Sequence, residues 1–158
     1  MGVSTRARYA LRMMVRLARL GAGASATVPN LSSDEGISPD YASQLMMAMR
    51  RAGLVKCRRG VGGGVILARP PSELSAADVI EAADGPIRVA ECDVDGMVCC
   101  RQARCATRSM WAEASRRLKT YFESVSLDTL AARAEARDGK DDVAPQKRQR
   151  CPGARSSG

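Results

Sequence analysis

Residues 36–68 read GISPDYASQLMMAMRRAGLVKCRRGVGGGVILA, and this stretch predicts a helix followed by a β-hairpin. The helix begins at Ser38, because serine is a good N-cap and the proline and aspartate after it suit a first helical turn. It ends before Gly53, which takes the C-cap role. Its buried face has the spacing i, i+3, i+4, i+7 and consists of Ala42, Leu45, Met46 and Met49. Two short strand-like runs, 54–58 and 65–68, flank a basic, glycine-rich tip and form the hairpin.

Further helices are expected on both sides of this unit. Residues 4–20 combine apolar residues at helical spacing with a stripe of arginines, and residues 32–35 form a brief second helix. A fourth helix begins at a cap formed by Ser75 and Asp78 and ends near Gly85. A long amphipathic helix covers 109–125, and Ser126 caps a last short helix. This order predicts a mainly α fold: a winged helix-turn-helix with a two-stranded β-wing and a long C-terminal dimerisation helix.

Four regions are therefore expected along the chain. Residues 1–71 form the winged helix-turn-helix DNA-binding domain, and residues 72–107 form a linking helix and a cysteine-rich loop. Residues 108–136 form the dimerisation helices. Residues 137–158 are polar, with almost no large apolar side chain, so we expect a disordered tail.

The composition excludes most familiar enzyme chemistry. The chain has 158 residues and no histidine, which removes Ser-His-Asp and Cys-His catalysis and every histidine-containing metal site. No paired acid and base and no phosphate-binding loop is recognisable, so we do not expect an enzyme. No apolar run is long enough to span a membrane, and arginines interrupt the N-terminal segment where a signal peptide would be apolar. We expect a cytoplasmic protein without membrane contact.

The positive charge is concentrated in the first part of the chain. Residues 1–69 carry 11 Lys or Arg and 3 Asp or Glu, whereas the remainder is balanced. Neutralising phosphates and releasing their counterions drives binding to nucleic acids. The asymmetry therefore indicates that residues 1–69 bind double-stranded DNA.

The third helix occupies the place of the reading helix of a winged helix-turn-helix. A glutamine there can pair with adenine, and hydroxyl groups can reach bases or phosphates. Wing glycines allow a close approach to the duplex, and wing arginines can contact phosphates or enter a narrow minor groove. The candidate DNA-binding residues are Arg8, Ser38, Tyr41, Ser43, Gln44, Arg50, Arg58, Arg59, Gly60, Gly62 and Gly63.

Over about residues 1–132 the sequence resembles the Rrf2 family of bacterial transcriptional regulators. The matching segments are TRARYALR at 5–12, GIS at 36–38, Tyr41, QL at 44–45, RRAGLVK at 50–56, RGVGGG at 59–64, LARPP at 67–71, DVI at 78–80, GP at 85–86 and TL at 129–130. The resemblance implies a homodimer in which the helix near 109–125 packs across its partner and two winged heads read a palindromic operator. Repression by blocking a promoter is the expected activity. Ser43 departs from the family pattern, where cluster-binding relatives often have Glu beside Gln, so the operator sequence is left open.

Four cysteines lie in the aperiodic segment before the long helix. Clustered thiolates can hold a soft metal or an iron-sulfur cluster. Three-cysteine loops of similar spacing, followed by a tryptophan such as Trp111, resemble the cluster-binding members of the family. We therefore expect Cys92, Cys99 and Cys105 to hold a [2Fe-2S] or [4Fe-4S] cluster, with Cys100 as a further candidate ligand.

The fourth ligand is open. Arg108 stands where some cluster-binding relatives have a histidine, and Arg8 stands where others use an aspartate across the dimer. Cys100, a carboxylate or an exchangeable small ligand remain. An incompletely ligated cluster is open to oxygen, nitric oxide or iron loss, so the hypothesis is a sensor of redox, nitric oxide or iron status.

Two alternatives stay open from the residues alone. The first is a cluster-free regulator controlled by thiol oxidation or by a partner protein. The second is a zinc-stabilised interaction module that does not bind DNA, although zinc ligation would require the adjacent sulfurs of Cys99 and Cys100. Cys57, on the first wing strand, is expected to be a small packing residue, and Cys151 has no expected role.

Overall fold

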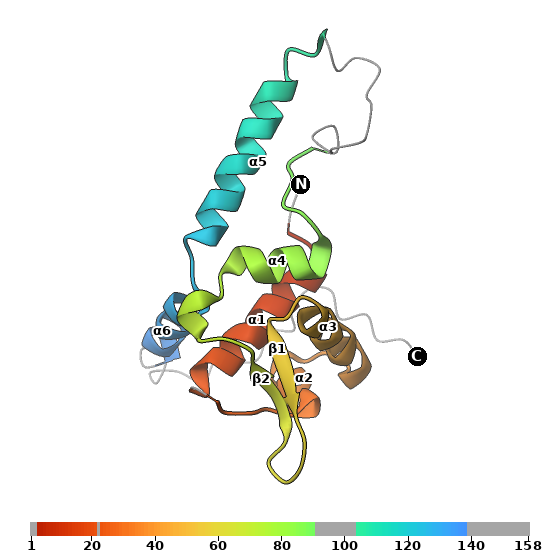
Figure 1. Ribbon diagram of the computed structural model, residues 1–158, viewed down its shortest axis with the longest axis vertical. Coiled ribbons are helices and arrows are strands. Elements are labelled where there is room, and N and C mark those ends of the chain that lie inside the picture. Colours follow the sequence, from red (N-terminus) through yellow and green to blue (C-terminus); the bar gives the residue numbers. More distant parts are fainter. Residues whose placement is uncertain (1–2, 22, 91–103, 139–158) are drawn as a thin grey trace.

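The computed structural model describes residues 3–21, 23–90 and 104–138. Its elements are α1 (Thr5–Arg19), α2 (Val28–Glu35), α3 (Pro39–Arg51), β1 (Val55–Arg58), β2 (Gly64–Leu67), a 3-10 turn (Pro71–Glu73), α4 (Ala76–Asp84), α5 (Arg108–Glu123) and α6 (Leu127–Asp138). The two strands pair antiparallel. The mainly α fold with a two-stranded wing is therefore confirmed (Figure 1).

Helix α1 lies at the centre of the body, in contact with α2, α3, α4 and α6. Its inward face buries Met13, Met14 and Leu17 almost completely. Met49 of α3 and Leu127 of α6 are buried in the same cluster. Burying each such side chain contributes about 1.5–3 kcal/mol, so methionine and leucine supply the core in a chain with few aromatic residues. This core crosses residue 71, and the expected division into domains stays a prediction.

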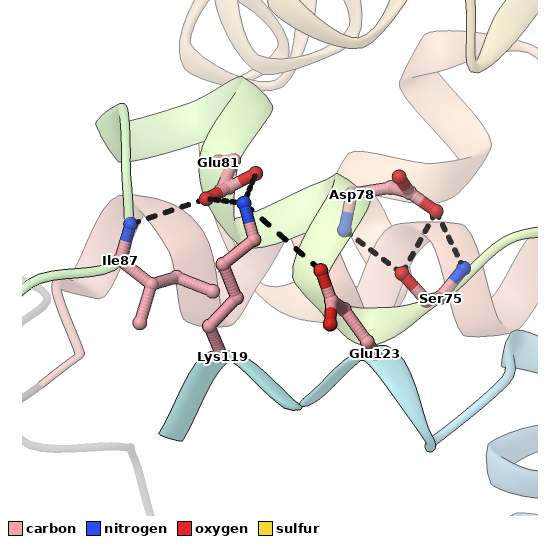
Figure 2. Close-up of polar contacts among 6 residues, drawn as sticks. All are labelled: Ser75, Asp78, Glu81, Ile87, Lys119 and Glu123. Atoms are coloured by element: carbon pink, nitrogen blue, oxygen red, sulfur yellow. Dashed lines mark hydrogen bonds and ion pairs between the residues drawn. The ribbon is translucent and has the colours of Figure 1, made fainter. Parts of the chain in front are cut away.

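Side-chain caps fix where the helices begin. Ser38 Oγ accepts a hydrogen bond from Tyr41 N–H at 3.2 Å. Ser75 and Asp78 form a reciprocal capping box at the start of α4, as Figure 2 shows. Ser126 Oγ accepts from Thr129 N–H at 3.1 Å at the start of α6. The predicted caps of these three helices are confirmed, and each is worth about 1 kcal/mol.

The predicted start of the second helix is wrong. Helix α2 begins at Val28 with Thr27 as its N-cap and a proline in the first turn, four residues before the expected start. Ser32, expected near the start, lies inside the helix and is buried, with its hydroxyl donating to Pro29 O at 2.8 Å. A mid-helix serine can satisfy its hydroxyl on a preceding carbonyl in this way, so Ser32 did not mark a terminus.

The wing is attached to the body by a backbone bridge that the sequence did not predict. Ala26, between α1 and α2, exchanges two backbone hydrogen bonds with Val65, N–H of Ala26 to O at 3.1 Å and N–H of Val65 to O at 2.8 Å. A Cβ on Gly64 would lie 2.5 Å from the Ala26 carbonyl oxygen. Glycine at position 64 therefore permits the close approach that anchors β2.

Helix α5 projects from the body, and its first turn lies farthest away (Figure 1). The connection from α5 to α6 is fixed by backbone hydrogen bonds, from Ala76 N–H to Val125 O and from Leu127 N–H to Leu74 O, both 2.8 Å. Helix α6 then packs against α1 and extends to Asp138, two residues into the expected tail. The rest of the expected disordered tail, with Cys151, lies outside the described residues. In the described part of the chain, every helix is too short or too polar to cross a membrane.

Candidate nucleic-acid interface

Helix α3 presents a polar face to solvent. Ser43, Gln44 and Arg50 are exposed on it, together with Met47, whose side chain is 51% exposed. Ser38 is exposed as well, although its hydroxyl is used as the cap. The structure therefore places Ser43, Gln44 and Arg50 on one exposed face of α3, and Ser38 at the exposed N-terminal end of the helix.

Tyr41 lies differently from these residues. It is half-buried, and its ring meets that of Tyr9 edge to face, with centroids 6.3 Å apart. The guanidinium of Arg12 lies 5.8 Å from the Tyr9 ring centroid on the same helix. Tyr41 therefore joins α3 to α1, and its contact with DNA stays a prediction.

The C-terminal end of α3 and strand β1 enclose an open, basic hollow. Arg50, Lys56 and Arg59 line it, together with Gly53, Val55 and Cys57. Three cations around one concavity provide a place for a phosphate group. Lys56, which is exposed on β1, was missed as a candidate, although its charge close to the predicted wing residues Arg58 and Arg59 was a signal for it.

Cys57 is not a packing residue, and that prediction is wrong. Its side chain is exposed on β1 and lines the hollow beside Arg50 and Arg59. The hairpin has only two strands, and only Val55 of β1 is buried. Most positions of β1 therefore remain open to solvent.

The wing tip is braced by contacts with the α1–α2 connection. Arg58 Nη1 donates to Gly23 O at 3.4 Å, and Ser25 Oγ donates to Gly62 O at 2.5 Å. A Cβ on Gly63 would lie 2.5 Å from the backbone oxygen of Arg58, so this glycine serves the turn itself. Arg59 and Gly60 are exposed at the tip, where they can approach a duplex.

Helix α1 divides its arginines between two uses. Arg8 is exposed in the first turns and donates to Thr5 Oγ1 at 3.0 Å. Arg16 pairs with Asp34 of α2 at 3.1 Å, and Arg12 Nε lies 2.6 Å from Glu35 Oε2. Burial raises the pKa of Glu35, and Arg12 offsets part of that effect. Arg12 and Arg16 therefore connect α1 to α2, whereas Arg8 lies on the exposed surface of α1.

Cys105 is the one predicted cluster ligand within the described residues. Its thiol is partly exposed just before α5, and its Sγ lies 3.3 Å from Thr107 Oγ1. That hydrogen bond lowers the thiol pKa, which favours the thiolate that metals require. Cys92, Cys99 and Cys100 lie outside the described residues. Within residues 3–21, 23–90 and 104–138, no group of three or more metal-ligating side chains is assembled.

Comparisons with known proteins agree on the class of protein. A family profile described as "Rrf2: Iron-dependent Transcriptional regulator" matches residues 3–133. The HTH-type transcriptional regulator IscR of Xenorhabdus nematophila is 32% identical over 150 residues, covering 94% of this chain and 90% of that protein. The structure of CymR, the global cysteine regulator of B. subtilis, matches with a TM-score of 0.70 and 30% identity, covering 84% of this chain and 98% of that chain.

A second solved structure, T. potens IscR, matches with a TM-score of 0.70 and 26% identity, covering 92% of this chain and 93% of that one. These similarities confirm the expected winged-helix architecture. They also confirm that the chain is similar to transcriptional regulators and not to enzymes.

Proposed function

This chain belongs to the Rrf2 family of DNA-binding transcriptional regulators, and we propose that it acts as a homodimeric repressor that senses redox, nitric oxide or iron status through an iron-sulfur cluster. The observation that carries the DNA-binding part is the shared exposure of the α3 face and the basic hollow beside it. Such a regulator works in the cytoplasm, where its operator is.

The exposed face of α3 is proposed to enter the major groove. Ser43 and Gln44 then face base edges, and Ser38 reaches a base or phosphate from the first turn. Arg50 and Arg59 hold phosphates on either side of the hollow, and Arg8 contacts the backbone from α1. Arg58 and the glycines Gly60, Gly62 and Gly63 shape the wing against the duplex.

Helix α5 is the proposed dimer contact. Its projecting part exposes Met110, Leu118 and Tyr121 at 51%, 37% and 58%. Large apolar side chains clustered on one projecting helix are costly in water and favour burial against a second copy. Two copies joined in this way would hold two heads at a fixed separation, as a palindromic operator requires.

The cysteines are the proposed cluster ligands. Cys105, with its accessible thiol of lowered pKa, fits a thiolate ligand, and we propose Cys92 and Cys99 as its partners with Cys100 as a further candidate. A bound cluster would supply chemistry that responds to oxygen, nitric oxide or iron supply. A change in the state of the cluster would then reach the DNA-binding heads through side chains of this chain.

DNA binding is tested first by selecting an operator from a random duplex pool with the full-length protein. The affinity for that operator should fall steeply with salt, and Arg59→Ala should reduce the salt slope by about 1 for each head. Arg133→Ala, an exposed arginine on α6, is the matched control and should leave the slope unchanged. Equal slopes in all three proteins would contradict the placement of the wing.

The cluster is tested by anaerobic purification, visible absorption, and iron and sulfide counts on the wild type and Cys99→Ala. A coloured, iron-loaded wild type and a colourless variant would support the cluster. A wild type that stays colourless after reconstitution but binds its operator would point to thiol or partner control. Zinc without iron, and no selected operator, would favour an interaction module.

A further inference from the structure

Helix α5 is connected to α4 by side chains that none of the roles above requires. Lys119 Nζ lies 3.0 and 3.3 Å from the two carboxylate oxygens of Glu81 on α4 (Figure 2). The same carboxylate accepts a long hydrogen bond, 3.4 Å, from Ile87 N–H. Glu81 therefore contacts α5 and also the arm, residues 86–90, that leads toward the cysteines.

Ser115 makes a second connection to this arm. It is the buried residue of α5, with 5% exposure, and its Oγ accepts from Val89 N–H at 2.9 Å. The same hydroxyl donates to Trp111 O at 2.9 Å, so both of its hydrogen-bonding roles are filled. Ser115 and Lys119 are one turn apart, and both lie on the side of α5 that meets the arm and α4.

These contacts restrain the tilt of α5 relative to the body. The lower end of α5 is fixed by the backbone bonds at Val125 and Leu127. Its 16 residues make it about 24 Å long, so a tilt of about 10° at that end moves the first turn by about 4 Å. The contacts at Glu81 and Ser115 lie between the fixed end and the free end, where they set the tilt.

Helix α4 connects α5 to the DNA-binding head. It packs against α1 and also contacts α3. Ser4, the N-cap of α1, donates to Asp84 Oδ1 at the end of α4 at 2.6 Å. A change in how α5 sits on α4 therefore reaches the two helices that carry the candidate DNA contacts.

We infer that Glu81 and Ser115 are positioning residues that join the arm, α5 and α4, so that the state of the cysteine segment reaches the DNA-binding head through these two side chains. The inference rests on the proposed function and names its internal connection. Cys92 lies only three residues beyond Val89 in the chain, so a ligand that fixes Cys92 also restrains the arm.

The ion pair between Lys119 and Glu81 is expected to affect the orientation of α5 more than the stability of the fold. The side chains of Lys119 and Glu81 are 45% and 30% exposed, and ion pairs of this kind add little to folding. Removing the pair should therefore leave a folded protein in which α5 is less restrained. Ser115→Thr keeps the hydroxyl and should preserve the arm contact, whereas Ser115→Ala removes it.

The first test follows amide hydrogen exchange in the metal-free, full-length protein. In Ser115→Ala the Val89 amide should exchange about fivefold faster, the effect of losing one typical hydrogen bond. Ser124→Ala is the matched control, because Ser124 Oγ donates only to Tyr121 O in its own helix. Unchanged exchange at Val89 in Ser115→Ala would overturn the arm contact.

The second test compares operator affinity of the iron-sulfur-reconstituted and metal-free protein. If cluster sensing operates, the ratio of these two affinities differs from one in the wild type. In Ser115→Ala and Glu81→Gln the ratio should move toward one by between about twofold and thirtyfold, with unchanged iron content. Glu113→Gln is the control, since Glu113 pairs with Arg116 and Arg117 of α5 alone.

The outcomes separate the two proposals. A wild-type ratio of one, with intact operator binding, refutes cluster sensing and the relay that depends on it. A wild-type ratio far from one that persists in both variants refutes the relay alone. A ratio lost in the variants and kept in Glu113→Gln and Ser115→Thr establishes Glu81 and Ser115 as the connection.

Discussion

Replacing Gly64 with alanine should break the backbone bridge between the wing and the body. Gly64 has φ of +151°, and a Cβ there would lie 2.5 Å from Ala26 O, whereas ordinary contact begins at 3.4 Å. The two backbones must therefore separate by about 0.9 Å. The bond from Val65 N–H to Ala26 O is now 2.8 Å long, and such a shift takes it beyond hydrogen-bonding distance.

The cost can be estimated from the bonds that are lost. The two hydrogen bonds between Ala26 and Val65 contribute about 1 kcal/mol each, and an alanine forced into this glycine conformation adds about 1 kcal/mol of strain. The free energy of unfolding should fall by about 3 kcal/mol. In a chain of this size that corresponds to a decrease in Tm of about 6–12 °C.

Thermal unfolding followed by circular dichroism measures this effect, and Gly60→Ala provides the comparison. Gly60 also has a positive φ, +95°, but a Cβ there meets no atom within 4 Å. Gly60→Ala should therefore lose only the strain term, about 1 kcal/mol. If both variants unfold within a degree or two of each other, the close approach of β2 to Ala26 is refuted as the reason for glycine at position 64.

Burial raises the pKa of Glu35 from its ordinary value of 4.5, and Arg12 opposes part of this rise. An NMR titration should therefore find the titration midpoint of the Glu35 carboxyl above 4.5, and the midpoint should rise further in Arg12→Met. The folded state then holds this proton more tightly than the unfolded state does. The stability of the wild type relative to Glu35→Gln should therefore be greatest below pH about 4.5 and fall as the pH rises through the folded-state pKa. A stability difference that stays constant with pH would contradict the raised pKa. Arg116 and its neighbour lower the pKa of Glu113 to about 2, so Arg116→Gln should move that pKa back toward 4.5, and an unchanged value would refute the pairing. The stabilisation from this pairing is present above pH about 4.5 and is lost as the pH falls toward 2. Alkylating Cys57 with iodoacetamide should weaken operator binding about tenfold, about 1.4 kcal/mol, because the adduct fills the basic hollow. The Cys57→Ala variant should bind the operator normally and should not respond to the reagent at this position. Equal sensitivity in both proteins would place the effect at another cysteine.

The sequence predicted the helices wherever the signals were local. Ser38 and Ser75 mark helix starts through bonds to residues three positions away, so their caps are legible without any tertiary information. The start of α2 was missed because Ser32 resembled a cap, although Thr27 and the proline two residues later carried the better signal. The proline in the first turn was therefore the local signal that could have located this helix start.

Contacts between distant segments were beyond the reach of sequence patterns. The bridge between Ala26 and Val65 joins residues 39 positions apart, and nothing in either segment identifies the other. The exposure of Cys57 depends on which faces of the hairpin are covered, which is also a tertiary property. The contact of Ser115 with Val89 is of the same kind, since a serine in an amphipathic helix usually faces solvent.

The structure explains why the charge of residues 1–69 is a guide to function. Arg12 and Arg16 are paired with Glu35 and Asp34, which are two of only three acidic residues in this part of the chain, and Arg19 pairs with Asp138. The other eight cations, which include those of the basic hollow, have no ion pair among the described residues. The acidic residues of α2 thus neutralise arginines within the body. The excess positive charge lies on α3, the wing and the start of α1. Eight cations also set an upper limit of about −7 on the salt slope of each head, because each neutralised phosphate contributes about −0.9.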